Sequence, residues 1–320
     1  MTVQDPAPSL EAEQSGITQP AHTPFSMVLR RFLRHRAAVV SAVFLASLVL
    51  VCVAAPLFEA WLGTTFADQD LFGRYAPPSP GHPLGQDEIG RDVLIRLLYG
   101  GRVSLLVGVA AALCAAVIGS LVGLLAGFYG GRLDALLMRF TDGVIALPIL
   151  PFLIILSAID LKKLGVPQTI ALSDEVSLYR IVIVVSLFGW TTVARLVRGG
   201  ALSVRQREYV RAALALGASN ARIMRVHVLP NVVSPIVVAV TLSIGHLILV
   251  ESTLSYLGVG IQLPLPSWGN MLVNAQDLIY SAPALAIYPG LMIFLTVIAF
   301  NFLGDGLQDA LDPRATSQKR

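Results

Sequence analysis

Residues 208–231 read EYVRAALALGASNARIMRVHVLPN, a basic stretch between two long hydrophobic runs. Its first half is rich in Glu, Arg, Ala and Leu, which favour an α-helix. Gly217 stands where a glycine ends such a helix, and Ser219 stands where a serine caps the start of another. Pro230 is expected to break this second helix. The stretch therefore predicts a helical hairpin on the surface of the membrane.

The composition on either side of the hairpin is typical of a membrane protein. Of 320 residues, 55% are hydrophobic and 13% are charged, whereas soluble domains carry about 25% charged residues. One globular core cannot bury this proportion of apolar residues, which favours several bilayer spans. Cys52 and Cys114 lie inside apolar runs and the five histidines are scattered, so no metal site is expected.

Six hydrophobic runs approach the roughly 20 residues that a helix needs to cross a bilayer. They are residues 37–57, 103–128, 143–159, 178–196, 232–257 and 283–303. The third run contains Pro148 and Pro151, which are expected to kink it. The sequence thus predicts an all-α membrane protein with six transmembrane helices.

The regions between the spans complete the predicted organisation. Residues 1–28 are polar and rich in Pro, Gln and Ser, which favours a disordered cytoplasmic tail. The other expected regions are a first transmembrane helix with a basic N-terminal flank (29–57), an external loop (58–102), a five-helix core (103–314) that includes the cytoplasmic hairpin region 198–230, and a C-terminal tail (315–320).

The end of the external loop reads GRDVLIRLLYGG, from Gly90 to Gly101. Four apolar residues share one helical face of this segment: Val93, Leu94, Leu97 and Leu98. Such a face predicts an interfacial helix that lies on the outer surface before the second span.

The distribution of Lys and Arg gives the expected orientation. With a cytoplasmic N-terminus, 16 of the 23 basic residues fall on the cytoplasmic side of the spans. Seven of these surround the hairpin: Arg195, Arg198, Arg205, Arg207, Arg211, Arg222 and Arg225. The bias predicts that both termini and the hairpin lie in the cytoplasm.

The second span carries a small residue at every fourth position: Ala111, Ala115, Gly119, Gly123 and Gly127. In lipid, helices associate where small residues let their backbones approach. This face is therefore expected to pack tightly on another helix.

The fifth span contains two ionisable residues, His246 and Glu251. A charge at mid-bilayer costs about 2.5–3.5 kcal/mol, which neighbouring Leu, Ile and Val residues offset. Glu251 either faces the bundle interior or a water-filled path, or lies near the outer interface with a structural partner. A structural role is favoured for His246. Glu251, Pro148 and Asn301 are the candidate residues of a translocation path or its gate.

Motifs of an ATP-driven motor or an enzyme are missing from the sequence. None of the three lysines, Lys162, Lys163 and Lys319, follows a glycine as a phosphate-binding loop requires. The patterns G-x-S-x-G and H-E-x-x-H are also missing. The chain is expected to be neither an enzyme nor a Walker-type ATP-binding protein.

The hairpin resembles the EAA loop of ABC importer permeases, which docks on the ATPase subunit. The family pattern is Glu-Ala-Ala, three residues, Gly, nine residues, a hydrophobic residue, any residue and Leu-Pro. The matching positions are Ala212, Ala213, Gly217, Leu229 and Pro230. Arg211 stands in place of the family's acidic residue, and His227 in place of the hydrophobic one. Glu208, one turn earlier, is a candidate substitute for the acid.

The resemblance covers nearly all of the chain beyond the first 28 residues. Six further blocks resemble the dipeptide/oligopeptide/nickel subgroup of these permeases: HPLGQDEIGRDVL (82–94), YGGRVSLLVG (99–108), ARLVRG (194–199), ESTLSYLGVG (251–260), PSWGNML (266–272) and NFLGDGLQDALDPR (301–314). The long external loop and the tail are similar to those of the C-type member of the two permeases.

The resemblance implies a type I ABC importer (MetI-like) fold and a place in the bacterial inner membrane. It implies that a second, homologous permease, two ATPase subunits and an extracytoplasmic binding protein are partners, with lipid around the chain and no nucleic acid. The ATPases would bind ATP and Mg²⁺, and this chain no cofactor. The implied substrates are di- or oligopeptides. The implied docking residues are Glu208, Arg211, Ala212, Ala213, Gly217, Ala218, Ser219, Arg222, Leu229 and Pro230.

Two other classes of membrane protein remain alternatives. A self-contained transporter driven by protons would use Glu251 and His246, and favours an internal repeat of spans. The sequence shows no convincing repeat. A polytopic membrane enzyme needs a convergent set of reactive residues, and no such set stands out.

Overall fold

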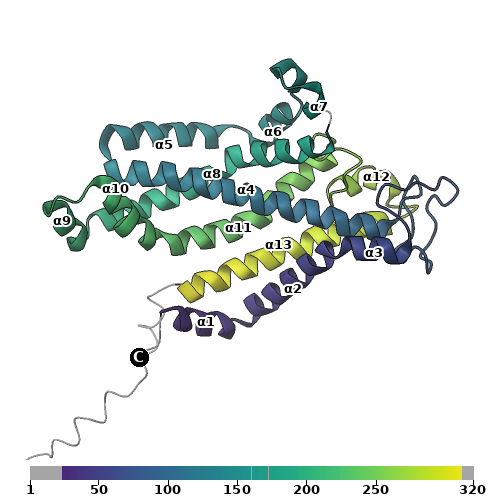
Figure 1. Ribbon diagram of the computed structural model, residues 1–320, viewed down its shortest axis with the longest axis horizontal. Helices are drawn as coiled ribbons and strands as arrows, with labels where there is room; N and C mark the ends of the chain where they lie inside the picture. Colours follow the sequence, from purple (N-terminus) through teal and green to yellow (C-terminus); the bar gives the residue numbers. More distant parts are fainter. Residues whose placement is uncertain (1–23, 160, 172, 312–320) are drawn as a thin grey trace, which may run out of the picture.

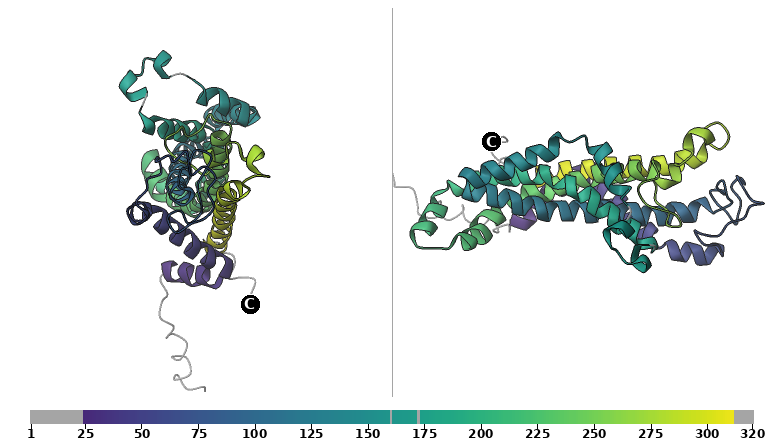
Figure 2. Two further views of the ribbon diagram at one scale, coloured as in Figure 1. Left: turned by 90° about the vertical axis from the view of Figure 1, so that its right-hand side faces the viewer. Right: turned by 90° about the horizontal axis from the view of Figure 1, so that it is seen from above.

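The computed structural model describes residues 24–159, 161–171 and 173–311, and these form an elongated helical bundle (Figures 1 and 2). Its first half contains α1 (Pro24–Arg34), α2 (Arg36–Val53), α3 (Ala55–Leu62), α4 (Val93–Tyr129), α5 (Gly131–Ala146), α6 (Ile149–Ser157), η3 (Leu161–Leu164) and α7 (Gln168–Ala171). The second half contains α8 (Asp174–Arg205), α9 (Glu208–Ala215), α10 (Asn220–Ile223), η4 (Met224–Val228), α11 (Leu229–Tyr256), η5 (Asn270–Leu272), α12 (Ala275–Leu278) and α13 (Ala284–Leu311). The described residues form no strand, which confirms the all-α prediction.

Within the described ranges, five continuous helical stretches are long and apolar enough to cross a membrane: α2, α4, α8, the run from Asn220 to Tyr256, and α13. A sixth crossing results if α5 and α6, which meet at a bend of 86°, are counted as one broken span. This agrees with the six predicted spans. The start of α1 and the end of α13 lie at the end of the bundle that carries α9, here called the hairpin end (Figure 1). The opposite end, with α3 and α12, is the loop end.

The third span is interrupted at Pro148, where one helix ends and another begins, whereas the sequence predicted only a kink. Leu147 is extended, as the residue before a proline usually is, and Pro148 is the N-cap of α6. The prediction of a second kink at Pro151 is wrong. Pro151 is the third residue of α6, where a missing N–H interrupts no bond within the helix.

The predicted interfacial helix does not exist as a separate element, because α4 runs without interruption from Val93 through the second span. Asp92 caps its start and accepts a hydrogen bond from the Ile95 backbone N–H at 2.8 Å. The 37 residues of α4 extend about 55 Å, which exceeds the roughly 30 Å of a bilayer core. Val93 and Leu97 are buried against the protein rather than facing lipid. Residue 102 therefore lies inside one continuous helix, and the predicted end of the external loop at this residue stays a prediction.

Both predicted tails lie largely outside the described residues. Residues 1–23 and 312–320 are not described, so the tail at 315–320 stays untested. Residues 24–28 belong to α1, so the N-terminal tail was extended too far. Arg31 and Arg34 lie in the last turn of this helix, which packs against α13. The basic flank of the first span is therefore helical.

The small-residue face of α4 packs against α8. A Cβ atom added at Gly119 or Gly123 would lie 2.5 Å from the carbonyl oxygen of Trp190 or Ala194, respectively. At Gly127 it would lie 2.7 Å from the carbonyl oxygen of Arg198. All three glycines therefore touch the backbone of α8, which confirms the predicted tight packing.

A methyl group on this face is predicted to destabilise the bundle. Gly123→Ala should lower the melting temperature of the detergent-solubilised protein, although alanine favours helices over glycine by about 1 kcal/mol. The matched control is Gly199→Ala in α8, where an added Cβ meets nothing within 4 Å. We expect the control to keep or raise the melting temperature. An equal response of the two variants would contradict the packing interpretation.

Candidate functional site

The hairpin, residues 208–228, begins with α9 and turns at Gly217. The Gly217 N–H donates to the Leu214 carbonyl and the Ala218 N–H donates to the Ala213 carbonyl, both at 3.0 Å. These two bonds form the Schellman arrangement that ends many helices. Gly217 has a φ of +81°, which a glycine adopts without strain. The predicted helix stop is confirmed.

The second arm of the hairpin starts at Ser219, whose hydroxyl accepts a hydrogen bond from the Arg222 N–H at 3.4 Å. The predicted N-cap is confirmed, but the predicted break at Pro230 is wrong. Helix α10, the π-helical turn η4 and α11 form one continuous helical run from Asn220 to Tyr256. In η4 the Leu229 N–H donates to the carbonyl of Met224, five residues back. We attribute the continuity to this wider turn, which accommodates the proline ring.

An apolar cluster fixes the hairpin to the bundle. Val210, Ile223 and Val228 are fully buried and belong to one hydrophobic cluster with Val204 of α8 and Leu124 of α4. Burying three such side chains stabilises the hairpin by about 1.5–3 kcal/mol each. The hairpin is therefore a rigid projection of the bundle, at the left of Figure 1.

The tip of the hairpin exposes apolar side chains outside the spans. Leu216 is 88% exposed, and Tyr209 and Leu214 are also exposed. The structure leaves most residues of the predicted docking set exposed: Glu208, Arg211, Ala212, Gly217, Ser219, Arg222 and Pro230. Ala213, Ala218 and Leu229 are half-buried. The hairpin thus combines an apolar tip with flanking arginines and a single nearby acid, Glu208.

Glu251 lies near the loop end of α11 and is fully buried. Its carboxyl oxygens accept hydrogen bonds from the hydroxyls of Ser255 at 2.7 Å and Ser104 at 2.9 Å. Ser255 in turn accepts the N–H of Ile261 at 3.0 Å, and Ser104 accepts the N–H of Trp268 at 3.2 Å. Two hydrogen-bonded chains therefore connect α4, α11 and the loop 257–273 through one carboxyl group. The carboxyl group thus faces the bundle interior, as in the first alternative for Glu251, and has structural partners, as in the second.

Glycines in α4 allow the loop 257–273 to approach this carboxyl group. A Cβ atom at Gly100 would lie 3.2 Å from the backbone of Ser267, and one at Gly101 would lie 2.9 Å from the Trp268 ring. The Trp268 ring is fully buried, and its Nε1 donates to the Leu97 carbonyl at 3.0 Å. The blocks 99–108, 251–260 and 266–272, far apart in sequence, thus form one junction.

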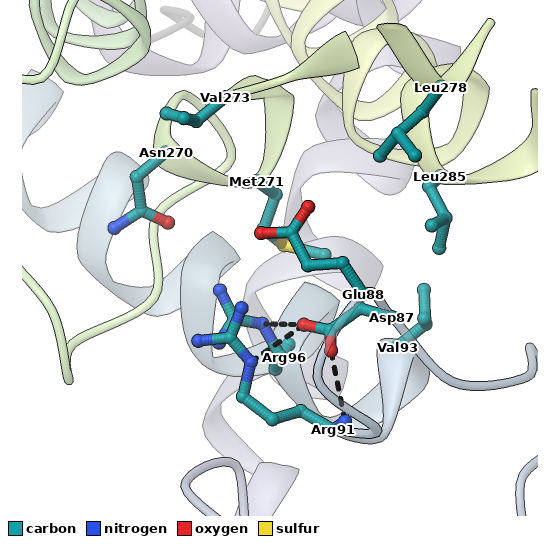
Figure 3. A pocket seen from close by; sticks show the side chains of 10 residues that line it. All are labelled: Asp87, Glu88, Arg91, Val93, Arg96, Asn270, Met271, Val273, Leu278 and Leu285. Atoms are coloured by element: carbon teal, nitrogen blue, oxygen red, sulfur yellow. Dashed lines mark hydrogen bonds and ion pairs between the residues drawn. The ribbon is translucent and has the colours of Figure 1, made fainter. Parts of the chain in front are cut away.

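A small polar pocket adjoins the junction at the loop end (Figure 3). The Asp87 carboxyl group lies between Arg91, with Nε at 2.7 Å, and Arg96, with Nε at 3.6 Å. Asn270 lines the opposite side of the pocket, which has a volume of about 30 Å³. Arg96 is 3% exposed, and its Nη1 atom finds no hydrogen-bond partner within the described residues. The pocket can hold about one water molecule beside this atom.

A much larger groove of about 860 Å³ runs between α8, α11 and α13. Pro230 and Leu311 line it at the hairpin end, and His246 lines it at mid-depth. Its polar lining residues are Thr192, Asn231, Ser234, Ser243, His246 and Gln308. Its volume is in the range of ligand pockets, about 300–1,000 Å³.

Of the predicted path residues, none lines the groove. Glu251 is enclosed in the junction, Pro148 is exposed at the break between α5 and α6, and Asn301 is exposed on α13. His246, for which a structural role was favoured, is an exposed groove residue. Polar residues that recur on one side of the fifth span, such as Asn231 and Ser234, were a signal that the sequence analysis missed. No group of three possible metal ligands occurs among the described residues.

Removing the carboxyl group of Glu251 is predicted to loosen the junction. In Glu251→Leu the buried hydroxyls of Ser104 and Ser255 lose their acceptor, at a cost of about 1–3 kcal/mol each. Hydrogen exchange measured by mass spectrometry should then accelerate at Ile261 and Trp268. Glu175→Leu, at an exposed position of α8, is the control and should leave exchange in this loop unchanged. Wild-type protection in Glu251→Leu would refute the structural role.

Comparisons with known proteins agree with this arrangement. Residues 119–317 match the family described as binding-protein-dependent transport system inner membrane component, and residues 23–78 match the N-terminal TM domain of oligopeptide transport permease C. The dipeptide transport system permease protein DppC of Alkalihalophilus pseudofirmus is 35% identical, with 93% of this chain and 92% of the relative covered. The glutathione transport system permease protein GsiD of Escherichia coli O6:K15:H31 is 40% identical, with 91% of each chain covered.

A solved structure described as an inward-facing conformation of the MetNI methionine ABC transporter shares the fold. Its TM-score is 0.53 at 19% identity, and the match covers 68% of this chain and 97% of that one. The likeness supports the predicted permease fold. The family match spans more than half of the chain, and the two relatives align along almost all of it. This protein therefore belongs to the family of binding-protein-dependent transport system inner membrane components, as a multi-pass permease subunit.

Proposed function

We propose that the chain is one of two different permease subunits of an ATP-driven importer for small peptides. The observation that carries the proposal is the rigid hairpin with an exposed apolar tip, on a permease whose sequence has no phosphate-binding loop. Leu216, Leu214 and Tyr209 are all exposed at one short helix outside the spans, and several exposed apolar side chains together favour a partner surface that covers them. The energy source then lies in that partner.

The proposed partner at the hairpin is an ABC ATPase subunit, one for each permease. A short helix such as α9 can bind in a groove of a partner protein. The groove then contacts apolar side chains that recur at helical spacing. Arg211 and Arg222 are exposed on the hairpin and offer positive charge to acidic residues around that groove. ATP and Mg²⁺ would be bound and turned over by the ATPases. The docking set predicted from the sequence is retained in this proposal.

The continuous run from Asn220 to Tyr256 provides a direct mechanical link from the ATPases to the membrane. Its first residues belong to the hairpin, and Pro230, Asn231 and His246 further along it line the groove. A movement of the hairpin would therefore tilt the helix that forms the wall of the groove. Rigid-body motion of this kind is a common means of switching between open and closed states. The π-helical turn η4 is the point on this run where bending is easiest.

The groove would form half of the translocation path, with a second, homologous permease completing it. The solute-binding protein would deliver peptide at the loop end, where residues 63–92 and 257–283 gather. The excess of Lys and Arg at the hairpin end supports a cytoplasmic hairpin and cytoplasmic termini in a bacterial inner membrane. The relatives named for dipeptide and glutathione transport support peptides as the substrate class.

A self-contained proton-driven transporter has less support. Glu251 and His246 are five residues apart on α11, so they point about 140° apart around the helix. Glu251 is fully buried among serines, whereas His246 lines the groove. The two side chains therefore do not form one proton path.

Co-purification in mild detergent, followed by uptake into proteoliposomes, tests the proposal. The tagged chain should recover an ATPase and a second permease in stoichiometric amounts. Peptide uptake by the reconstituted complex should require binding protein and internal ATP. A chain that is recovered alone and takes up peptide in response to a proton gradient would refute the proposal.

A charge at the tip of the hairpin is predicted to weaken ATPase attachment. Leu216→Asp should reduce co-purified ATPase at least tenfold, because a carboxylate replaces the most exposed apolar side chain of the tip. The matched control is Phe72→Asp, which alters a fully exposed side chain in the loop region before α4. The control should retain the ATPase. Undiminished recovery with Leu216→Asp would exclude the tip from the interface.

The turn at Gly217 is predicted to be necessary for coupling. Valine strains a backbone with a φ of +81°, whereas asparagine tolerates this conformation. Gly217→Val should lose most substrate-stimulated ATP hydrolysis, and Gly217→Asn should retain it. Equal ATP hydrolysis in the two variants would show that the turn conformation does not matter.

A further inference from the structure

We propose that His246, with Thr192 and Ser243, forms a subsite that binds the C-terminal carboxylate of the peptide midway along its path. The inference rests on the proposed import function and adds the place at which this chain contacts the substrate. It assigns a binding role to a residue that the sequence patterns did not mark.

Two hollows meet at these three residues. The groove of about 860 Å³ extends from the hairpin end, and a smaller hollow of about 120 Å³ lies beside α6, between α8 and α11. Thr192, Ser243 and His246 line both. A substrate that passes from one hollow to the other must therefore contact them. The smaller hollow is otherwise mostly apolar, with Phe188 and Leu153 in its wall.

The subsite lies near the middle of the bilayer. His246 is 17 residues from the start of α11 and 10 residues from its end, or about 26 Å and 15 Å along the helix. Thr192 on α8 and His246 are both exposed side chains. Polar side chains at this depth are expensive when they face lipid and usually line a pathway. Their position thus favours contact with water and solute.

The chemistry of the subsite suits a carboxylate. Imidazole and hydroxyl groups can all donate hydrogen bonds to its oxygens. The Ser243 hydroxyl donates to the Ala239 carbonyl at 2.7 Å in this structure and would turn towards the ligand. Among the described residues, no Asp or Glu lines either hollow, so no acid from this part of the chain repels an anion at the subsite. A dipeptide and glutathione, the substrates in the names of two relatives, both carry terminal carboxylates.

The lining also explains why binding at this point would be brief. Within the described part of the chain, neither hollow is lined by Arg or Lys, whose ion pair with a carboxylate is strong and often bidentate. A carrier must release its substrate, and hydrogen bonds from a histidine and two hydroxyls give only moderate affinity. The subsite therefore binds the substrate selectively and still releases it readily.

The test uses the assembled transporter in nanodiscs without binding protein, so that only the membrane subunits select the ligand. Saturation-transfer NMR, which detects weak binding, compares trialanine with its C-terminal amide. The wild type should bind the free acid at least fivefold more tightly. His246→Leu should remove this preference, and His246→Gln, which keeps an N–H donor, should retain part of it. The control Thr253→Ala, on the same helix but outside both hollows, should keep the full preference.

Any other outcome would refute the proposed subsite. Equal binding of acid and amide by the wild type, no binding at all, or a preference that persists in His246→Leu would exclude a carboxylate contact at His246. ATP-driven trialanine uptake by the same complex in proteoliposomes separates the two proposals. Uptake without a His246-dependent preference refutes only the subsite, whereas an absence of ATP-driven uptake also refutes the import function.

Discussion

The contact between the backbones of α4 and α8 is the constraint on which the other parts of the protein depend. Lipid supplies little hydrophobic driving force between helices, so their association relies on close packing. Gly119, Gly123 and Gly127 provide it, because each removes the side chain that would separate the two helices. The hairpin core is built on this contact, since its buried valines rest on both α4 and α8. At the other end α4 also carries Ser104, which holds the junction through Glu251.

The roles of the polar groups differ between the two ends of the bundle and its middle. At the loop end, the Glu251 carboxyl group is enclosed by serines and serves to hold a loop against two helices. At the hairpin end, the arginines of the hairpin are exposed, whereas the half-buried Arg198 pairs with Asp134 and fixes α5 on α8. In the middle, His246 and Thr192 remain exposed to a groove. A bilayer makes each unpaired polar group expensive, so this pattern separates the polar groups that hold helices and loops together from those that line the groove.

The sequence identified the hairpin well because its signals are local. Gly217 ends α9 and Ser219 begins α10 through bonds within five residues, and such bonds depend little on the rest of the fold. The expected break at Pro230 does not occur, because a helix can continue through a proline when a wider turn precedes it. The turn η4 follows Ile223 and ends at Val228, and both side chains are buried against the bundle. Residues 93–101 likewise belong to α4, and loop 257–273 packs against them at Gly100 and Gly101.

The sequence by itself determined the membrane class, the number of spans, the glycine face of α4 and the hairpin with its turn. These features depend on hydrophobic length and on residue spacing along one helix, which are properties of a short segment. The tertiary structure alone decided that Glu251 is enclosed and that His246 lines a groove. Each of these depends on which face of a helix meets a neighbour distant in sequence. Hydrophobicity along one segment cannot distinguish a side chain that faces protein from one that faces a groove.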